Sequence, residues 1–346
     1  MKEKKNYITY LNVIAAMAVL IQHSSGYAQR VFRIGRAWRG VNLLTTLFHF
    51  AVPIFFMITG ATLMDFSDRY SLKEYFVKRI QKTLIPFIIW SVIGFFYYGY
   101  VLQTLDVEKY FGPVEFFNGF MSTDYIAIYW FFPKLFLIYL AMPLFSAVEK
   151  SKRKAVFTYL VVGGFLISYI YPEIDSLFNL GLDQSVIIVP ASKGLLIPLV
   201  GYLISEYEMP KKGRMAVYIL SVMAFIAMLV ITDQYSINAK ANIDAVRGWN
   251  KPLTLVYSIG IFTWFRYNAN SEMKGKIAKL FEWVAGYTFG IYLFHKPFMD
   301  TVKRGFGISA YSPFWVFGMP IVSLVVCVIV IYLVRKIPVV NKLLFP

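Results

Sequence analysis

Apolar residues occur in ten long runs along the chain, and short polar segments separate them. A helix needs about 20 mainly apolar residues to cross the hydrocarbon core of a bilayer. The pattern predicts ten transmembrane helices, at Tyr7–Gly26, Asn42–Met64, Thr83–Val101, Tyr125–Ala147, Val156–Tyr171, Ser185–Ile204, Met215–Thr232, Pro252–Phe265, Val284–Met299 and Ser312–Val334. We therefore expect an all-α polytopic integral membrane protein. It reads as a single membrane-embedded domain over residues 1–346 with no soluble domain attached.

The composition supports this interpretation. Of 346 residues, 58% are hydrophobic and 16% are charged, whereas soluble domains carry about 25% charged residues. A soluble enzyme, a disordered chain and a secreted disulfide scaffold are therefore excluded. The single cysteine, Cys327, cannot form an internal disulfide. The N-terminal lysines before an apolar run are typical of a signal peptide, but no small-residue cleavage site follows, so we expect an uncleaved first helix.

The formal net charge of +16 would suggest a nucleic-acid partner on a soluble protein. Sorted by the predicted loops, 22 Lys and Arg residues lie on the side of the termini and 10 on the opposite side. The positive-inside rule then places both termini in the cytoplasm, and we expect no nucleic-acid partner. The first loop, with four arginines, runs against this trend, and either a functional basic patch or contact with lipid phosphates explains it.

The chain contains three histidines, and ionisable groups inside a membrane are costly enough to suggest function. His23, His49 and His295 are all predicted toward the external face. One buried histidine is often a neutral hydrogen-bonding group, but three at a common depth favour a polar cavity that opens outward. A haem held by two histidines or a zinc site lacks supporting ligands, so we expect no metal.

Two further polar features involve the cytoplasmic half of the membrane. Asn12 and His23 are eleven residues apart, so both face the same side of the first helix, roughly 16 Å apart along its axis. Arg79 and Lys82 are i,i+3 neighbours at the cytoplasmic border. This basic pair suits phosphate groups arriving from the cytoplasm, or equally extends toward lipid headgroups.

The sequence resembles a known family, the multi-pass membrane O-acyltransferases of acyltransferase family three, which modify bacterial surface sugars. The segment Tyr10–His23 resembles the family's opening helix, whose motif is an arginine, ten further residues and a histidine. His23 occupies the histidine position, and Asn12 stands where the family has arginine. Other matching segments, in the family order, are Ala51–Gly60 with Thr59 for serine, Arg79-x-x-Lys82 with Pro86, Trp130-Phe131 with Tyr139 and Pro143, and Phe289–His295. The resemblance covers nearly the whole chain.

The resemblance implies transfer of an acyl group, usually acetyl, from cytoplasmic acyl-CoA to a hydroxyl of a cell-surface polysaccharide or lipid-linked glycan, in a bacterial cell membrane. His23 is the expected catalytic residue, acting as a general base or as a transient nucleophile. Arg79, Lys82 and Asn12 are expected to bind the donor. The expected acceptor-binding residues are His295, His49, Trp130 and Lys134, although Lys134 has snorkelling as an alternative role.

Two other functions stay open on sequence grounds. Because position 12 lacks the family arginine, the protein is alternatively an exporter of polysaccharide or a small-molecule transporter on the same fold. A third alternative is a non-catalytic membrane subunit that scaffolds a glycan synthase. The acyl group, the sugar and the oligomeric state do not follow from the sequence.

Overall fold

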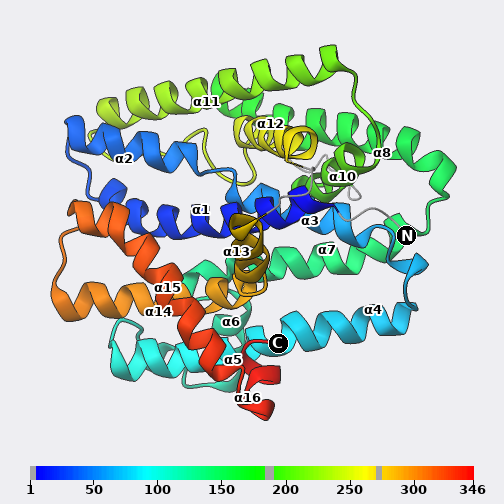
Figure 1. Ribbon diagram of the computed structural model, residues 1–346. Coiled ribbons are helices and arrows are strands. Elements are labelled where there is room, and N and C mark those ends of the chain that lie inside the picture. The colour runs from blue at the N-terminus through cyan, green and yellow to red at the C-terminus, as the bar shows by residue number, and fades with distance from the viewer. Residues whose placement is uncertain (1–4, 184–190, 270–274) are drawn as a thin grey trace.

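The computed structural model describes residues 5–183, 191–269 and 275–346, and within these ranges the regular elements are all helices (Figure 1). The main helices are α1 (Asn6–Arg30), α2 (Arg36–Leu47), α3 (Ala51–Leu63), α4 (Leu72–Arg79), α5 (Ile85–Phe96), α6 (Pro113–Met121), α7 (Phe131–Ser146), α8 (Lys150–Gly164), α9 (Tyr171–Phe178), α10 (Lys193–Glu206), α11 (Lys211–Ala239), α12 (Pro252–Asn268), α13 (Lys276–Ala285), α14 (Thr288–Phe306), α15 (Met319–Val334) and α16 (Pro338–Leu344). This confirms the all-α class.

Seven helical segments of the described residues are long and apolar enough to cross a membrane. They are Asn6–Arg30, Arg36–Asp68, Leu72–Val101, Ala127–Ser146, Lys150–Ser176, Lys211–Ala239 and Phe314–Val334, and each contains or overlaps a predicted span. The other three predicted spans coincide with α10, α12 and α14, which have 14, 17 and 19 residues. The first six residues of the span predicted at Ser185–Ile204 lie outside the described residues. The protein is thus a multi-pass membrane protein, with seven spans supported by length and composition.

The second predicted span is not one continuous helix, because α2 and α3 are separated by a turn at residues 48–50. Pro53 lies in the first turn of α3 and has no backbone N–H. The carbonyl of His49 therefore loses its helical i+4 donor, and the helix breaks there. The break places His49 in an irregular segment between two helices.

A second departure from regular helix lies between α4 and α5, where Ile80–Leu84 forms a π-helical turn. Pro86 removes the donor for the carbonyl of Lys82, so the preceding turn widens. The widened turn separates the environments of two predicted donor-site residues. Arg79 is half-buried at the end of α4, whereas Lys82 is exposed in the π-turn.

The centre of the bundle is formed by α1, which contacts α2, α3, α12, α13, α14 and α15 (Figure 1). Its buried side carries aromatic and aliphatic residues such as Tyr7, Leu11 and Leu20. Aromatic pairs extend the core outward, among them Phe56 stacked on Phe131 with ring centroids 5.0 Å apart. A helix surrounded by six others can present polar side chains to neighbours on every side.

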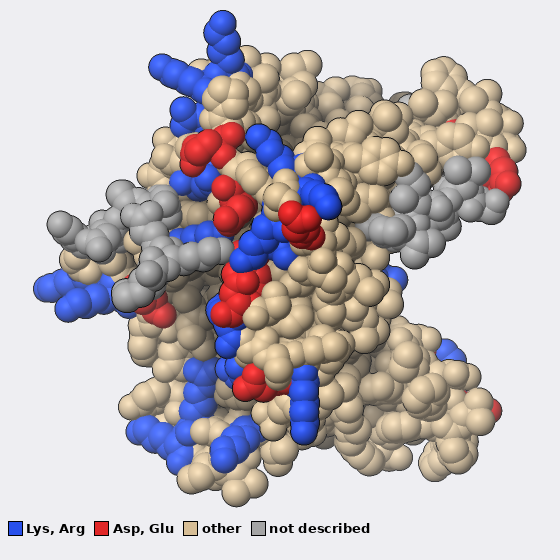
Figure 2. Space-filling view, turned by 90° about the vertical axis from the view of Figure 1, so that its right-hand side faces the viewer, with Lys and Arg blue, Asp and Glu red and all other residues tan. Residues whose placement is uncertain are grey.

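The N-terminal end of α1 lies on a charged face of the molecule (Figure 2). Lys and Arg side chains cross this face with Asp and Glu between them, and several are paired. Arg153, which is 2% exposed, donates to Asp65 Oδ1 at 2.6 Å, and Lys150 donates to Asp68 at 2.8 and 2.6 Å. These ion pairs join α8 to the segment that follows α3.

Helices α3 and α10 pack extensively and closely against each other. A Cβ atom added to Gly60 would collide with backbone atoms of Pro198, and one added to Gly201 would collide with backbone atoms of Met57. Small residues let helices in a membrane approach until their backbones touch. This contact fixes α10 against the side of α3 that carries Met57 and Gly60.

We expect Gly201→Ala to force α3 and α10 apart, because backbone atoms cannot move aside as a flexible side chain can. The destabilisation should be about 1–3 kcal/mol, measured as a lower thermal unfolding temperature of the detergent-purified protein. Gly194→Ala is the matched control, since it lies on the same helix with open space at its Cβ position. Equal melting temperatures for both variants would contradict the close packing.

Candidate functional site

A cavity of about 220 Å³ lies among α1, α3, α7 and α14. Its polar lining residues are Asn12, Thr59, Tyr139, Thr288 and Tyr292, and the remaining walls are aliphatic and phenylalanine side chains. Asn12 Nδ2 donates to Thr288 Oγ1 at 3.1 Å. Thr59 and Tyr139 lie in segments that resemble the family motifs, with Thr59 in place of serine, so residues singled out on three separate segments meet in this cavity.

Arg79 lies beside this cavity through Tyr139. The guanidinium carbon is 5.4 Å from the centroid of the Tyr139 ring and 5.7 Å from that of Tyr75. Its Nε atom is buried and has no hydrogen-bond partner. A cation over aromatic rings keeps its charge available for a further anionic partner. Lys82, exposed in the π-turn, does not share this setting.

A narrower space of about 10 Å³ continues from the cavity toward the far end of α1. Phe55, Thr288 and Tyr292 line both spaces, and His295 lines the narrow one. The His295 ring is fully buried, and its centroid is 5.2 Å from that of His23. The structure thus brings two of the three histidines into contact at the end of the path that starts near Asn12.

His49 is the third histidine and reaches α1 from another side. Its Nδ1 is 3.2 Å from Nε2 of Gln22, the residue next to His23. His49 therefore contacts the same turn of α1 as the histidine pair but does not touch His295. All three histidines gather around residues 22 and 23.

The two remaining predicted acceptor residues have different settings. Trp130 stacks on Trp249 with ring centroids 5.8 Å apart, and Trp249 also contacts Phe56 edge-on at 6.0 Å. Lys134 is exposed on α7 and is not among the described residues that line the cavity. The structure places Trp130 against the bundle core and Lys134 at its surface.

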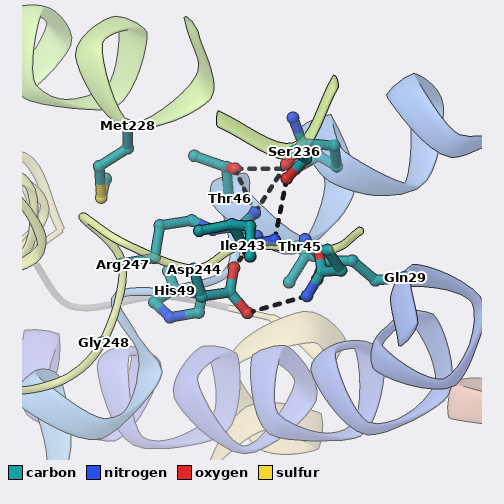
Figure 3. Close-up of polar contacts among 12 residues, drawn as sticks. Gln29, Thr45, Thr46, His49, Met228, Ser236, Ile243, Asp244, Arg247 and Gly248 are labelled. Atoms are coloured by element: carbon teal, nitrogen blue, oxygen red, sulfur yellow. Dashed lines mark hydrogen bonds and ion pairs between the residues drawn. The ribbon is translucent and has the colours of Figure 1, made fainter. Parts of the chain in front are cut away.

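Sequence reasoning missed Arg247, a buried arginine in the loop between α11 and α12 (Figure 3). Its Nη1 donates to Asn42 Oδ1 at 2.8 Å and to Thr46 Oγ1 at 2.9 Å, and its Nη2 pairs with Asp244. Burial lowers the pKa of Arg247, and the Asp244 carboxylate opposes that shift. The arginine ties this loop to α2 one turn from His49. A loop position carries no helical pattern that would reveal it.

Two larger hollows lie apart from the predicted residues. One, of about 330 Å³, is lined by Lys5 and Arg69 but also by Asp65 and Asp68, and carboxylates repel phosphate. The other, of about 390 Å³, is almost entirely apolar between α5 and α14. In the described ranges, no three His, Cys, Asp or Glu side chains gather closely enough to hold a metal ion. The Asn12 cavity is therefore the best candidate site.

The comparison with protein families gave one match, an acyltransferase domain, over residues 5–334. The matched region includes α1 to α15 and every residue named in the cavity and the histidine pair. The comparisons with curated proteins and with solved structures found no match.

Replacing Arg247 should destabilise the protein, because Asn42 and Thr46 would keep buried acceptors without a donor. We expect Arg247→Met to cost about 1–3 kcal/mol, seen as a lower thermal unfolding temperature in detergent. Arg36→Met, at an exposed arginine on the N-terminal end of α2, serves as the control and should change stability little. A melting temperature for Arg247→Met equal to that of the control would show that the loop is not held by this arginine.

Proposed function

Because the chain belongs to acyltransferase family three, we propose that it is a membrane O-acyltransferase. In this proposal it moves an acyl group, acetyl in the first instance, from cytoplasmic acyl-CoA to a hydroxyl of a cell-surface polysaccharide or lipid-linked glycan. The N-terminal end of α1 faces the cytoplasm, and the histidine pair lies toward the outside. The observation that carries the proposal is that Phe55, Thr288 and Tyr292 line both the Asn12 cavity and the narrow space at His295.

The donor enters from the end of the molecule where α4 lies. Arg79, held over Tyr139, has the charge and the unpaired N–H to meet a phosphate or the polar arm of the donor. The thioester then occupies the Asn12 cavity, whose apolar walls suit an acyl chain. Asn12 offers a neutral amide where the family has arginine, so in this proposal Arg79 supplies the positive charge beside the donor.

The acceptor meets the acyl group at the histidines. A hydroxyl is a weak nucleophile at neutral pH, and an imidazole within reach can take its proton as the new C–O bond forms. His23 is half-buried and His295 fully buried, so His23 is the more accessible of the two. We assign the general-base role to His23. Gln22 and His49 hold the turn of α1 that carries it.

We expect His23→Ala cells to lose an ester-linked acyl group from a surface glycan while the protein still inserts. Mass spectrometry of the glycan before and after mild alkali gives the readout, and deletion of the protein should give the same spectrum. Gly26→Ala is the control on the same helix, because nothing lies within 4 Å of its Cβ position. Normal acylation in His23→Ala cells would remove the catalytic assignment, and trapped intracellular glycan with normal acylation would indicate export.

For the donor, we expect Arg79→Gln to raise the apparent KM for acyl-CoA roughly ten- to a hundredfold, as for a lost charge-assisted hydrogen bond. Lys82→Gln should have a smaller effect that fades at high salt, because Lys82 is exposed and its charge is screened. Lys78→Gln is the control, since its ammonium lies 3.9 Å from the Tyr70 ring centroid, away from the cavity. An unchanged KM in Arg79→Gln would show that this arginine has only a structural or lipid-facing role.

A further inference from the structure

His295 has one paired and one unpaired ring nitrogen. The ring is 0% exposed, and Nδ1 donates to the carbonyl of Ile291 at 2.8 Å. A carbonyl can only accept, so Nδ1 carries the hydrogen and Nε2 carries the lone pair. Nε2 is buried without a hydrogen-bond partner. It is the only imidazole nitrogen among the buried, unpaired side-chain atoms of the described residues.

A buried acceptor with no partner destabilises a fold, and folded proteins keep few of them. The helix does not need an imidazole here, since a leucine of similar size would fill the same space. The cost of the unpaired nitrogen therefore indicates a role in which Nε2 takes up a proton.

The surroundings indicate where that proton comes from and where it goes. On one side, the His295 space shares Thr288 and Tyr292 with the donor cavity. On the other side, the His23 ring is in contact at 5.2 Å between centroids. The space beside His295, about 10 Å³, is at the lower limit for a single water molecule. His295 thus stands between the acceptor-side imidazole and the donor, with almost no room for bulk water.

We propose that His295 is a second catalytic residue, the donor-side proton carrier of the transfer reaction. This proposal rests on the acyl-transfer function proposed above and assigns separate tasks to the two imidazoles. His23 takes the proton from the acceptor hydroxyl, His295 Nε2 receives it from His23, and His295 returns it to the sulfur of the departing CoA.

The step balances in atoms and charge. The acceptor oxygen forms a bond to the acyl carbon, and the bond from that carbon to the CoA sulfur breaks. The hydroxyl proton passes from oxygen to His23, to His295 and finally to the thiolate. Both imidazoles end neutral, and no other reactant is required. Because almost no water fits beside His295, the thioester is protected from hydrolysis while it waits for the acceptor.

The test uses membrane vesicles from the producing cells, which contain the native acceptor, supplied with labelled acetyl-CoA. His295→Leu should lower acyl incorporation by about 10²–10⁴-fold, as for loss of an acid–base group. The purified variant should melt at the same temperature as the wild type or higher, because the unpaired nitrogen is gone. His49→Leu is the contrasting variant and should melt lower, since it leaves Gln22 Nε2 without its partner.

A change of leaving group separates proton delivery from structural damage. Thiophenolate is a far weaker base than the CoA thiolate and departs without being protonated. With labelled S-phenyl thioacetate as donor, the defect of His295→Leu should shrink to less than about tenfold. The defect of His23→Ala should stay, because the acceptor hydroxyl still has to lose its proton.

Three results would overturn the assignment of His295. These are incorporation in His295→Leu within threefold of the wild type, an equal loss with both donors, or a lower melting temperature that accompanies the loss. Failure of the proposed function is recognised separately, because the wild-type vesicles would then transfer no acyl group to glycan from acetyl-CoA, and the proton-carrier role would fall with it.

Discussion

The pairing of α1 with α14 is the contact on which the rest of the structure depends. It is polar at three levels: Asn12 with Thr288, His23 with His295, and Tyr27 with Asp300. At the third level Lys296 also pairs with Asp300, and Tyr98 donates to Asp300 at 2.7 Å. Polar groups inside a bilayer must find partners within the protein. The two helices therefore fix each other's depth and rotation, and the cavity and the histidine pair lie along the seam between them.

The other polar side chains of α1 are satisfied by different neighbours. Ser24 donates to the carbonyl of Val316 at 3.2 Å, and Ser25 accepts from Thr45 at 3.1 Å. Against this nearly complete pairing, the unpaired Nε2 of His295 is an exception at the place where chemistry is expected. Arg79 Nε, beside the Asn12 cavity, is also unpaired. The other buried side-chain atoms of the described residues without a hydrogen-bond partner lie on Arg214, Thr232, Asp233, Arg247 and Ser323, none of which lines the cavity or the narrow space at His295.

The sequence predicted the helices well, because apolar runs of that length have few other stable structures. It also placed Asn12 and His23 on one helix face, and both contact α14 as that geometry requires. It did not predict the break at His49 or the π-turn that contains Lys82, since each depends on the backbone donor that a proline four residues after His49 or Lys82 removes. The π-turn is why Arg79 and Lys82 differ in burial despite their i,i+3 spacing. The role of Arg247 could not be predicted, because nothing in a loop sequence indicates which buried acceptors its arginine will contact.

The size of the path also constrains how the two substrates meet. The Asn12 cavity, of about 220 Å³, can hold an acyl group and part of its thiol arm, whereas the space at His295 is about 10 Å³. Neither of these two spaces is large enough in this structure for a polysaccharide. In the proposed mechanism, the acyl end of the thioester enters this space after small rotations of Leu20 or Phe55, which line the constriction. The proposed acyl transfer requires only that an acyl group reach the histidines along this seam, whereas export would require the glycan itself to pass through the protein.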